Sequence, residues 1–505
     1  MAYFLSFTVE IVKYKCKNDG TMKNIVKRIT CITCVMVAST LFLNIPAQAK
    51  PPASTDVVII GAGLSGLATA YGLKKAGIPY HILELTPRIG GRVRTISYKM
   101  EDGEELHADS GMEEYWESNP GVKILKELKL PLSQDDALSS IPLDGKLYEY
   151  DVDSSDEFLK KMFTPDELAA RESLKAKVAA ILPDLKKTPI PAETMKLKDI
   201  SFSAWVLATK VPKKVSEWVR ISIECETGLE WTKFSALDGI EEMHIFMGKG
   251  EQSFRVIGGN EKFADALANN VGKGNITTNA RVSKVVKNGK FSIVNYYDQV
   301  TNHRNSIKAK YVVSTVPLYR FAMEVQFEPA LSNQKIGAIA SQSYGSYFKA
   351  HIFVPAEAEK FWMKGGKSFL PIVSDSELGV IYFGNPDQEK SKTKIVSLLV
   401  SGARAEAFNF MNQDQARAMI VSGFDRLWPG FSKMIKGMEF YRFHPRAIAA
   451  WPVGRSRFDD LSNEIRKPEN NLFLAGDFTE SSHSDGAFIS AERVVKQIVS
   501  MRSKK

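Results

Sequence analysis

The fold of this chain is decided by the stretch Asp56-Val57-Val58-Ile59-Ile60-Gly61-Ala62-Gly63-Leu64-Ser65-Gly66. Its first half is a continuous apolar, β-branched run, as a parallel strand buried on both faces requires. Its second half is a glycine-rich turn, and helix-forming residues follow from Leu67 to Ala76, before a glycine in the usual C′ position. A second apolar strand, residues 80–83, then ends at Glu84. The order predicts a strand, a tight turn, a helix and a second strand.

The three glycines of this turn have different tasks in a dinucleotide-binding unit. Gly61 makes the tight turn, Gly63 lets the backbone approach a pyrophosphate, and Gly66 lets the helix and the strand pack closely. The pyrophosphate then lies at the helix N-terminus, where free N–H groups and the helix dipole favour negative charge. Glu84 follows at the end of the second strand, where a carboxylate can accept hydrogen bonds from an adenosine ribose. The unit therefore predicts nucleotide binding.

The residues after Glu84 indicate which dinucleotide is bound. They read Thr86-Pro87-Arg88-Ile89-Gly90-Gly91-Arg92-Val93-Arg94-Thr95. This segment closely resembles the glycine-glycine-arginine extension of the flavin-containing amine oxidase superfamily, which includes monoamine, polyamine and L-amino-acid oxidases, protoporphyrinogen oxidases and carotenoid-type desaturases. In that family the extension continues along the FAD pyrophosphate. Glycines expose backbone N–H groups there, and arginine offers a fixed donor fork for phosphate.

The resemblance extends from about Thr55 to about Val499. It includes the acid-and-glycine segment at residues 108–111, the backbone that contacts adenine at Val282, and the strand and turn at residues 471–477, whose acid would accept from ribityl hydroxyls. The residues that the resemblance assigns to FAD are Gly61, Gly63, Leu64, Ser65, Gly66, Glu84, Arg88, Gly90, Gly91, Arg92, Val282, Gly476, Asp477, Gly486 and Ala487.

The resemblance also implies the fold class. We expect an α/β chain with a Rossmann-like FAD-binding domain of the glycine-glycine-arginine type and an interleaved α+β substrate-binding domain. The FAD-binding domain is expected in residues 50–120, 251–320 and 446–505. The substrate-binding domain is expected in residues 121–250 and 321–445, with a Lys-rich helical insert at 150–200 that begins at the capping box Thr164-Pro165-Asp166-Glu167.

Lys349 is the candidate catalytic lysine. In amine oxidases of the family one lysine bridges through a water to flavin N5, on a strand ending in aromatic residues, and Ser343 to Phe353 resembles that strand. Period-2 alternation places Lys349, His351 and Phe353 on one face. An ammonium near N5 can orient a water and stabilise the reduced flavin anion. From the residues alone, without the resemblance, an ordinary lysine on an edge strand is the preferred interpretation.

Two departures from the family are visible. Some members tether FAD through a cysteine near the C-terminal strand, but this chain has none after Cys225, so noncovalent FAD is expected. Amine oxidases also flank the substrate with two aromatic rings. Counted back from Gly486, the second ring position is His483, and the first is expected at Trp451. The residues alone also fit a core tryptophan and a histidine that is hydrogen-bonded within a turn.

The substrate is expected to be a cationic amine. L-Amino-acid oxidases have an arginine for the substrate carboxylate shortly after the glycine that Gly111 matches, whereas Glu113 and Glu114 stand here. Carboxylates would repel an amino-acid carboxylate and attract a cation. The leading prediction is an oxidase that uses O2 and releases an imine or aldehyde and H2O2. The alternatives are a lipophilic desaturase or protoporphyrinogen-type oxidase, suggested by residues 446–454, and a flavin-binding protein without turnover.

Composition excludes other classes. The 505 residues are 44% hydrophobic and 25% charged, which are ordinary globular proportions, so collagen-like and disordered chains are excluded. The four cysteines fit neither a disulfide scaffold nor the usual Cys–His zinc spacings, and no metal site is expected. The formal charge of +9 falls to +5 without residues 1–49, which carry six Lys or Arg and two acids. That excess is too small to indicate nucleic-acid binding.

The N-terminus predicts export. Residues 22–49 combine a basic start, an apolar run from Ile29 to Ile45, and Ala47-Gln48-Ala49, which places small residues at −3 and −1 of a cut before Lys50. We expect a periplasmic or secreted protein. The alternative is an uncleaved anchor formed by residues 29–45, because about 17 apolar residues stand at the lower limit for spanning a bilayer.

Overall fold

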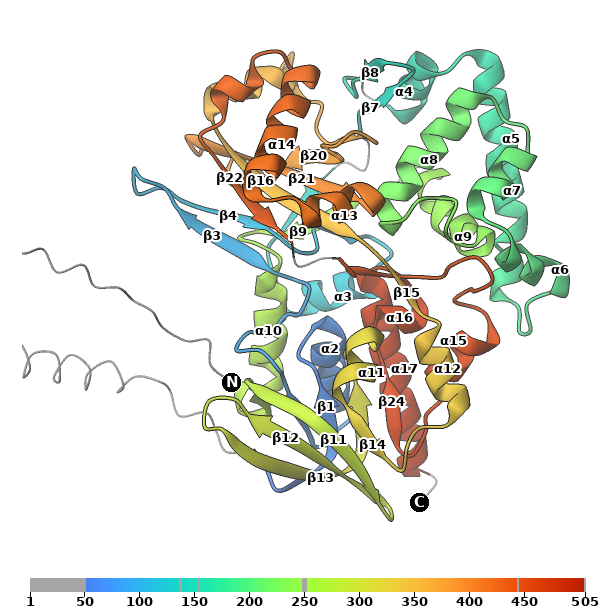
Figure 1. Cartoon of the computed structure of the whole chain (residues 1–505), viewed down its shortest axis with the longest axis vertical. Coiled ribbons are helices and arrows are strands. Elements are labelled where there is room, and N and C mark those ends of the chain that lie inside the picture. The colour runs from blue at the N-terminus through green and yellow to red at the C-terminus, as the bar shows by residue number, and fades with distance from the viewer. Residues whose placement is uncertain (1–50, 136–138, 153, 248–251, 443–444, 504–505) are drawn as a thin grey trace, which may run out of the picture. The chain divides into compact units, whose positions relative to one another are not determined.

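The structure of the chain is a computed structural model that describes residues 51–135, 139–152, 154–247, 252–442 and 445–503 (Figure 1). The predicted signal at residues 22–49 and the alternative anchor at residues 29–45 lie outside the described residues. In the part of the chain that the structure does describe, no helix has the length and apolar character needed to cross a membrane.

The strand that precedes the glycine-rich turn is central to an eight-stranded sheet. The order of the sheet is β10-β2-β1-β13-β12-β11-β14, and β24 also pairs with β13. β1 runs parallel to β2 and to β13, whereas β12 is antiparallel to both of its neighbours. The strands are β1 (Ser54–Ile60), β2 (Tyr80–Leu83), β10 (Ile276–Thr277), β11 (Ala280–Asn288), β12 (Phe291–Asp298), β13 (His303–Ser314), β14 (Gln326–Glu328) and β24 (Leu472–Leu474).

Two hydrophobic cores cover the two faces of this sheet. Val57 and Ile59 of β1 pack into the first core, and Val58 and Ile60 into the second. All four side chains are buried, as the apolar run predicts for a parallel strand between two layers. Helices that contribute to the first core are α2 (Leu64–Lys75), α3 (Pro120–Glu127), α10 (Glu261–Val271) and α17 (Ser484–Ser503); those in the second are α11 (Leu318–Glu324), α12 (Asn333–Ala340) and α15 (Asp460–Arg466).

A second sheet lies at the other end of the molecule, next to helices α13 (Gly402–Phe410) and α14 (Gln413–Leu427) (Figure 1). Its order is β19-β20-β21-β16-β22, with antiparallel neighbours. Phe348, Ala350 and Ile352 of β16 point into its core. Its strands are β16 (Tyr347–Pro355), β19 (Ile372–Val373), β20 (Val380–Phe383), β21 (Thr393–Ser401) and β22 (Gly437–Tyr441).

The Lys-rich insert is helical, as predicted. The expected capping box is present: Thr164 Oγ1 accepts from Glu167 N at 3.3 Å, and Glu167 Oε2 accepts from Thr164 N at 2.9 Å. Leu174 and Val178 are buried on the inner face. The helices of the insert are α4 (Ser155–Met162), α5 (Pro165–Ile181) and the short α6 (Ala192–Met195), and α7 (Phe202–Ala208), α8 (Lys213–Thr227) and α9 (Ala236–Met247) follow it in the chain.

Candidate active site

A cavity of about 860 Å³ connects the parallel edge of the main sheet with the second sheet and the helical insert. It begins where β1 and β2 end and reaches residues of β16, α5 and α8. The carboxyl ends of parallel strands are the usual ligand-binding edge of an open α/β sheet. The expected dinucleotide-binding residues that line this cavity are Gly61, Gly63, Leu64, Ser65, Glu84, Gly90, Gly91, Arg92, Val282, Gly476, Asp477 and Ala487.

The glycines of the turn differ in what requires them. Gly61 has φ +105°, and a Cβ on Gly66 would lie 2.0 Å from the carbonyl oxygen of Gly61, so the protein's own packing excludes side chains at both positions. Gly63 is different, because its φ is ordinary and a Cβ there would meet nothing closer than the Cα of Gly91, at 3.8 Å. No protein atom therefore explains the glycine at 63, and a ligand lying against the N-terminus of α2 does.

Glu84 is held in place at the end of β2 by main-chain and hydroxyl donors. Its Oε2 accepts from Ala62 N at 2.7 Å, and its Oε1 accepts from Thr86 N at 2.9 Å and Thr86 Oγ1 at 2.8 Å. The carboxylate therefore lies beside the glycine-rich turn and lines the cavity. This arrangement fits a ribose of a dinucleotide whose pyrophosphate lies at the turn.

The two arginines that the resemblance assigns to FAD, Arg88 and Arg92, differ in their contacts. Arg88 does not line the cavity: its Nη1 donates to the carbonyl oxygens of Ile89 and Val93, and it pairs with Glu261 at 3.2 Å. The expectation that Arg88 contacts the dinucleotide is therefore wrong for this structure, because its donors are used to shape the loop. Arg92 does line the cavity.

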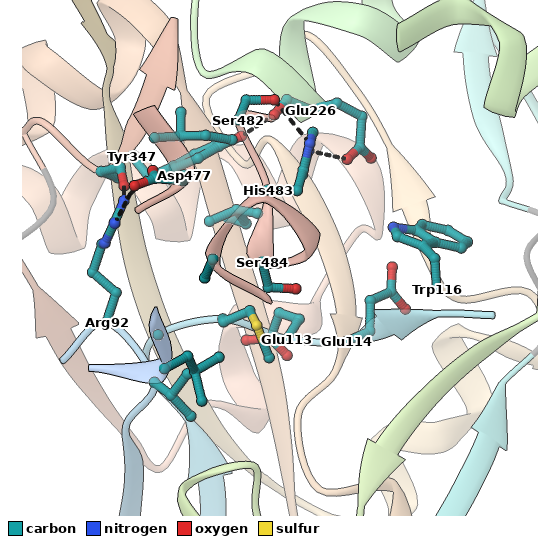
Figure 2. A pocket seen from close by; sticks show the side chains of 18 of the residues that line it. Arg92, Glu113, Glu114, Trp116, Glu226, Tyr347, Asp477, Ser482, His483 and Ser484 are labelled. Atoms are coloured by element: carbon teal, nitrogen blue, oxygen red, sulfur yellow. Dashed lines mark hydrogen bonds and ion pairs between the residues drawn. The ribbon is translucent and has the colours of Figure 1, made fainter. Parts of the chain in front are cut away.

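Arg92 and Asp477 form a bidentate pair across the cavity wall (Figure 2). Nη1 donates to Oδ2 at 2.6 Å and Nη2 to Oδ1 at 2.7 Å, and Nη1 also donates to the carbonyl oxygen of Ala447 at 2.6 Å. The resemblance assigned these two residues to separate parts of FAD, whereas the structure makes each the other's partner.

Gly486, which the resemblance also assigns to FAD, has a packing role like that of Gly66, since a Cβ there would lie 2.3 Å from the carbonyl oxygen of Ser481.

Lys349 lies on β16, an interior strand of the second sheet, between β21 and β22. The alternative of an edge-strand lysine is therefore wrong. The side chain is 1% exposed and lines the cavity, and its Nζ donates to the carbonyl oxygen of Gly111 at 2.8 Å. His351 lies on the same face, as the alternation predicts, and its Nε2 is 3.2 Å from the carbonyl oxygen of Asp109.

Glu113 joins Lys349 to Arg255. Its carboxylate is ion-paired with Lys349 Nζ and lies 3.6 Å from Arg255 Nη1. Both cations also lie over the ring of Tyr382, Lys349 at 5.6 Å and Arg255 at 5.5 Å from its centroid. The expectation that Glu113 attracts a cationic substrate therefore needs correction, because two cations of the protein already neutralise this carboxylate.

Burial shifts the proton affinity of this cluster. Burial lowers the pKa of Lys349 to about 7, although the nearby carboxylate of Asp109 opposes the shift. Burial, together with the charge of Lys349, lowers the pKa of His351 to about 3. Lys349 can thus gain or lose its proton near neutral pH, whereas His351 stays neutral.

His483 lies on the cavity wall between two carboxylates. Nε2 is 3.6 Å from Glu226, Nδ1 is 3.6 Å from Glu242, and Nδ1 is also 2.9 Å from Ser482 Oγ. Burial works against the charged imidazole, but Glu242 and Glu226 outweigh it and raise the pKa of His483 to about 10. A charged imidazolium, rather than a neutral aromatic ring, therefore stands at this position.

The two carboxylates beside His483 have different surroundings. Glu242 is buried and pairs with Arg457 at 2.5 Å, and although burial opposes it, Arg457 and His483 lower the pKa of Glu242 to about 2. Glu226 lines the cavity, at the C-terminal end of α8, and its side chain is 28% exposed. Figure 2 shows it beside His483, on the same side of the cavity as Trp116 and Glu114. Glu226 is therefore an acidic group that a ligand can reach.

Trp451 does not line the cavity, so the predicted pairing of Trp451 and His483 around a substrate is wrong. Its ring is buried in the second core, its Nε1 donates to Ser462 Oγ at 3.1 Å, and the guanidinium of Arg457 lies 4.9 Å from its centroid. Trp451 directly follows strand β23 (Ile448–Ala450), in which successive side chains point to opposite faces. Ile448 faces the cavity, so Trp451, three residues later, faces the second core.

Several cavity residues were missed by the sequence analysis. The rings of Tyr347, Tyr382 and Trp116 line the cavity, and so do Glu226 and Arg255. Tyr347 could have been found from the sequence, because it lies two residues before Lys349 and strand alternation puts the two on one face. In the structure its hydroxyl lies within hydrogen-bond distance of the carbonyl oxygens of Cys225 and Glu226, at 2.8 and 2.7 Å. The others come from segments with no recognisable motif.

The chain matches one protein family over most of its length and has relatives among oxidases. The model of the family described as flavin containing amine oxidoreductase matches residues 64–499. The chain is 24% identical over 475 residues to the probable flavin-containing monoamine oxidase A of Dictyostelium discoideum, which covers 88% of this chain and 97% of that protein. It is also 24% identical over 453 residues to an L-amino-acid oxidase of Sistrurus catenatus edwardsii, covering 85% of this chain and 83% of that protein.

Among solved structures, the chain is similar to wild-type putrescine oxidase bound to putrescine. The TM-score is 0.73 at 18% sequence identity, and the match covers 88% of this chain and 99% of that chain. At this identity the likeness is one of fold.

Proposed function

Because this chain belongs to the flavin-containing amine oxidoreductase family, we propose that it oxidises a small cationic amine with noncovalently bound FAD and passes the electrons to O2. In the overall reaction a C–H and an N–H bond of the amine are lost and a C=N bond forms. The two electrons and two protons reduce O2 to H2O2. Water then hydrolyses the imine to an aldehyde and ammonia or an amine.

Three expectations from the sequence are confirmed. The family is the one that the glycine-glycine-arginine segment suggested, the fold is the FAD-binding fold of amine oxidases, and the protein is an FAD-dependent oxidoreductase. Relatives that act on monoamines, L-amino acids and polyamines favour amine oxidation over a lipophilic desaturase or a flavin-binding protein without turnover.

The residues present fit FAD. The open space at Gly63, the N-terminus of α2 and the fixed carboxylate of Glu84 suit a pyrophosphate and an adenosine ribose. When bound, FAD would supply the acceptor for the two electrons removed from the amine. Noncovalent binding is supported by the sequence, which has no cysteine after Cys225. Cys225 itself lines the cavity, but burial raises the pKa of its thiol and so disfavours the thiolate that a tether would require. Flavin released from the protein by acid or heat tests this point.

Glu226 and Lys349 would act on the substrate at the other end of the cavity. Glu226 is a carboxylate that a ligand can reach and would accept hydrogen bonds from the amine, while His483 holds it in place. Lys349 would present a buried ammonium at the reacting centre, where it can orient a water and stabilise negative charge. Glu113 holds this ammonium from the side, and Arg255 shares the same carboxylate.

One observation carries this proposal: the dinucleotide cradle and the buried Lys349 line the same cavity, on segments almost 290 residues apart. The test is an aerobic assay for H2O2 with monoamines, diamines, polyamines and amino acids, with catalase as the control. We expect catalase-sensitive peroxide from at least one cationic amine. Peroxide from none of them, with flavin that is reduced by a polyene or a porphyrinogen instead, would contradict the proposal.

A further inference from the structure

The same cavity contains a buried guanidinium far from the dinucleotide cradle in sequence and in fold. Arg171 lies on α5, lines the cavity and is 4% exposed. Its guanidinium carbon lies 5.0 Å from the ring centroid of Trp218, which comes from α8 and also lines the cavity. A cation stacked on an indole is fixed in orientation. Arg171 is therefore a rigid donor group on the cavity wall.

In the described part of the chain, one edge of this guanidinium has no protein acceptor. Nη1 donates to Oε1 of Glu172 at 2.5 Å. Among the described residues no acceptor is found for Nε, which is buried, and none is recorded for Nη2. Nε and Nη2 form the edge that binds a carboxylate with two parallel hydrogen bonds. A buried donor without an acceptor is costly, and a small shift of the side chain would bring Nε to the cavity beside Nη2, so this edge suits a ligand that supplies two oxygens.

The side chains around Arg171 indicate that the rest of the ligand is apolar. Trp218, the ring on which Arg171 stacks, belongs to an apolar cluster, and the members of this cluster that line the cavity include Ile141, Phe158, Leu159 and Met162. Three other charged residues line this end, namely Asp156, Glu172 and Lys175. Glu172 is 57% and Lys175 42% exposed, and Asp156 is also exposed, so water screens their charges. Burial lowers the pKa of Arg171 against the opposing carboxylate of Glu172, so an anion would relieve an unfavourable charge.

We propose that Arg171 is a carboxylate-binding subsite, so that the substrate carries its amine at one end of an apolar body and a carboxylate at the other. The proposal rests on the proposed function, because it names the substrate of the same cavity. It excludes two neighbouring classes. An α-amino acid would place its carboxylate at the amine end, next to Glu226, and a diamine would place its second ammonium against Arg171.

The first test uses the unchanged protein. Three series of equal chain length are compared: n-alkylamines, α,ω-diamines and ω-amino acids, each with anaerobic flavin reduction as the readout. We expect ω-amino acids above a minimum length to show apparent dissociation constants roughly 10- to 100-fold lower than alkylamines, the range that a charge-assisted hydrogen bond supports. Equal affinity for all three series, or a preference for the diamines, would overturn the proposal.

Variants test whether Arg171 causes the preference for ω-amino acids. Arg171→Met should abolish the preference for ω-amino acids and leave the constant for alkylamines within about twofold. Glu172→Gln removes the negative charge beside the guanidinium while keeping an acceptor for Nη1, so it should strengthen carboxylate binding, an effect of opposite sign. Lys177→Met is the matched control, since Lys177 is exposed on the same helix and does not line the cavity. If Arg171→Met fails to fold, Glu172→Gln and the inhibition of the unchanged protein by n-alkanoic acids remain decisive, because neither requires loss of the arginine.

The Arg171 subsite and the proposed amine oxidation can be refuted separately. Oxidation of alkylamines with no carboxylate preference, and no inhibition by alkanoic acids, would overturn the Arg171 subsite and leave amine oxidation intact. No amine oxidised in any series would overturn the proposed function itself. Tight binding of alkanoic acids that persists in Arg171→Met would also overturn the subsite, because the carboxylate would then lie elsewhere.

Discussion

Replacement of Lys349 by methionine tests the catalytic end of the cavity. The change keeps the length and the apolar bulk of the side chain but removes the ammonium. Glu113 then loses one of its two cations and keeps Arg255, 3.6 Å away, so it is not left as an isolated buried charge. We therefore expect a folded protein that still binds FAD. Loss of one preorganised electrostatic contact at a reacting centre typically costs about 3 kcal/mol, or roughly 10²-fold in rate.

The pKa gives this effect a direction with pH. Since burial lowers the pKa of Lys349 to about 7, the ammonium predominates at acidic pH and the neutral amine at alkaline pH. The advantage of the parent protein over Lys349→Met should therefore be largest at acidic pH and should shrink as the pH rises through about 7. A ratio that grows with pH would refute the assignment of the ammonium as the active form.

The assay is stopped-flow absorbance of the flavin, with anaerobic reduction by substrate and reoxidation by O2 measured separately, because the lysine can serve either half-reaction. Lys360→Met is the control: Lys360 is exposed on the 3-10 helix Ala356–Phe361 and should have little effect. If Lys349→Met matches the parent in both half-reactions, Lys349 has only a structural role and amine oxidation loses its main catalytic residue.

Three further predictions concern the cofactor, the N-terminus and the core. Gly63→Val should give folded but colourless protein, because the new side chain would occupy the space of the ligand. Gly274→Val, at another glycine with open space around it, is the control and should stay yellow. Absorbance measures the bound flavin, and circular dichroism measures folding. We propose that the exported protein begins at Lys50; N-terminal sequencing that finds residues before Ile29 would favour the anchor. Trp451→Phe should lower the free energy of unfolding by about 1 kcal/mol through the lost bond to Ser462 and leave substrate KM unchanged; a large change in KM would contradict its place in the core.

The fold was predictable where local sequence determines local structure. The expected strand at residues 80–83 has the observed bounds, and the helix after the glycine-rich turn is observed as Leu64–Lys75, three residues earlier than its first expected residue. The alternation around Lys349 was also predicted correctly, because a strand between two neighbours keeps a period of two. These features depend on a few residues in sequence and on steric rules.

The candidate site was predicted less completely, because partners across the cavity are far apart in sequence. The Arg92–Asp477 pair spans 385 residues, and no pattern indicates that each would use the other's hydrogen-bonding edge. Glu113 was interpreted as a free acid, since the sequence does not show that Lys349 and Arg255 would approach it. Trp451 was misplaced by one step of strand alternation, which reverses the face on which a side chain lies.

Anaerobic titration of the purified protein with cationic amines tests the central claim most directly. The account predicts yellow protein whose flavin absorbance bleaches on addition of at least one amine and returns when O2 is admitted, with H2O2 formed in amounts equal to the flavin reoxidised. Flavin that no amine bleaches, in protein that holds FAD and is bleached by dithionite, would contradict the claim that this cavity oxidises amines.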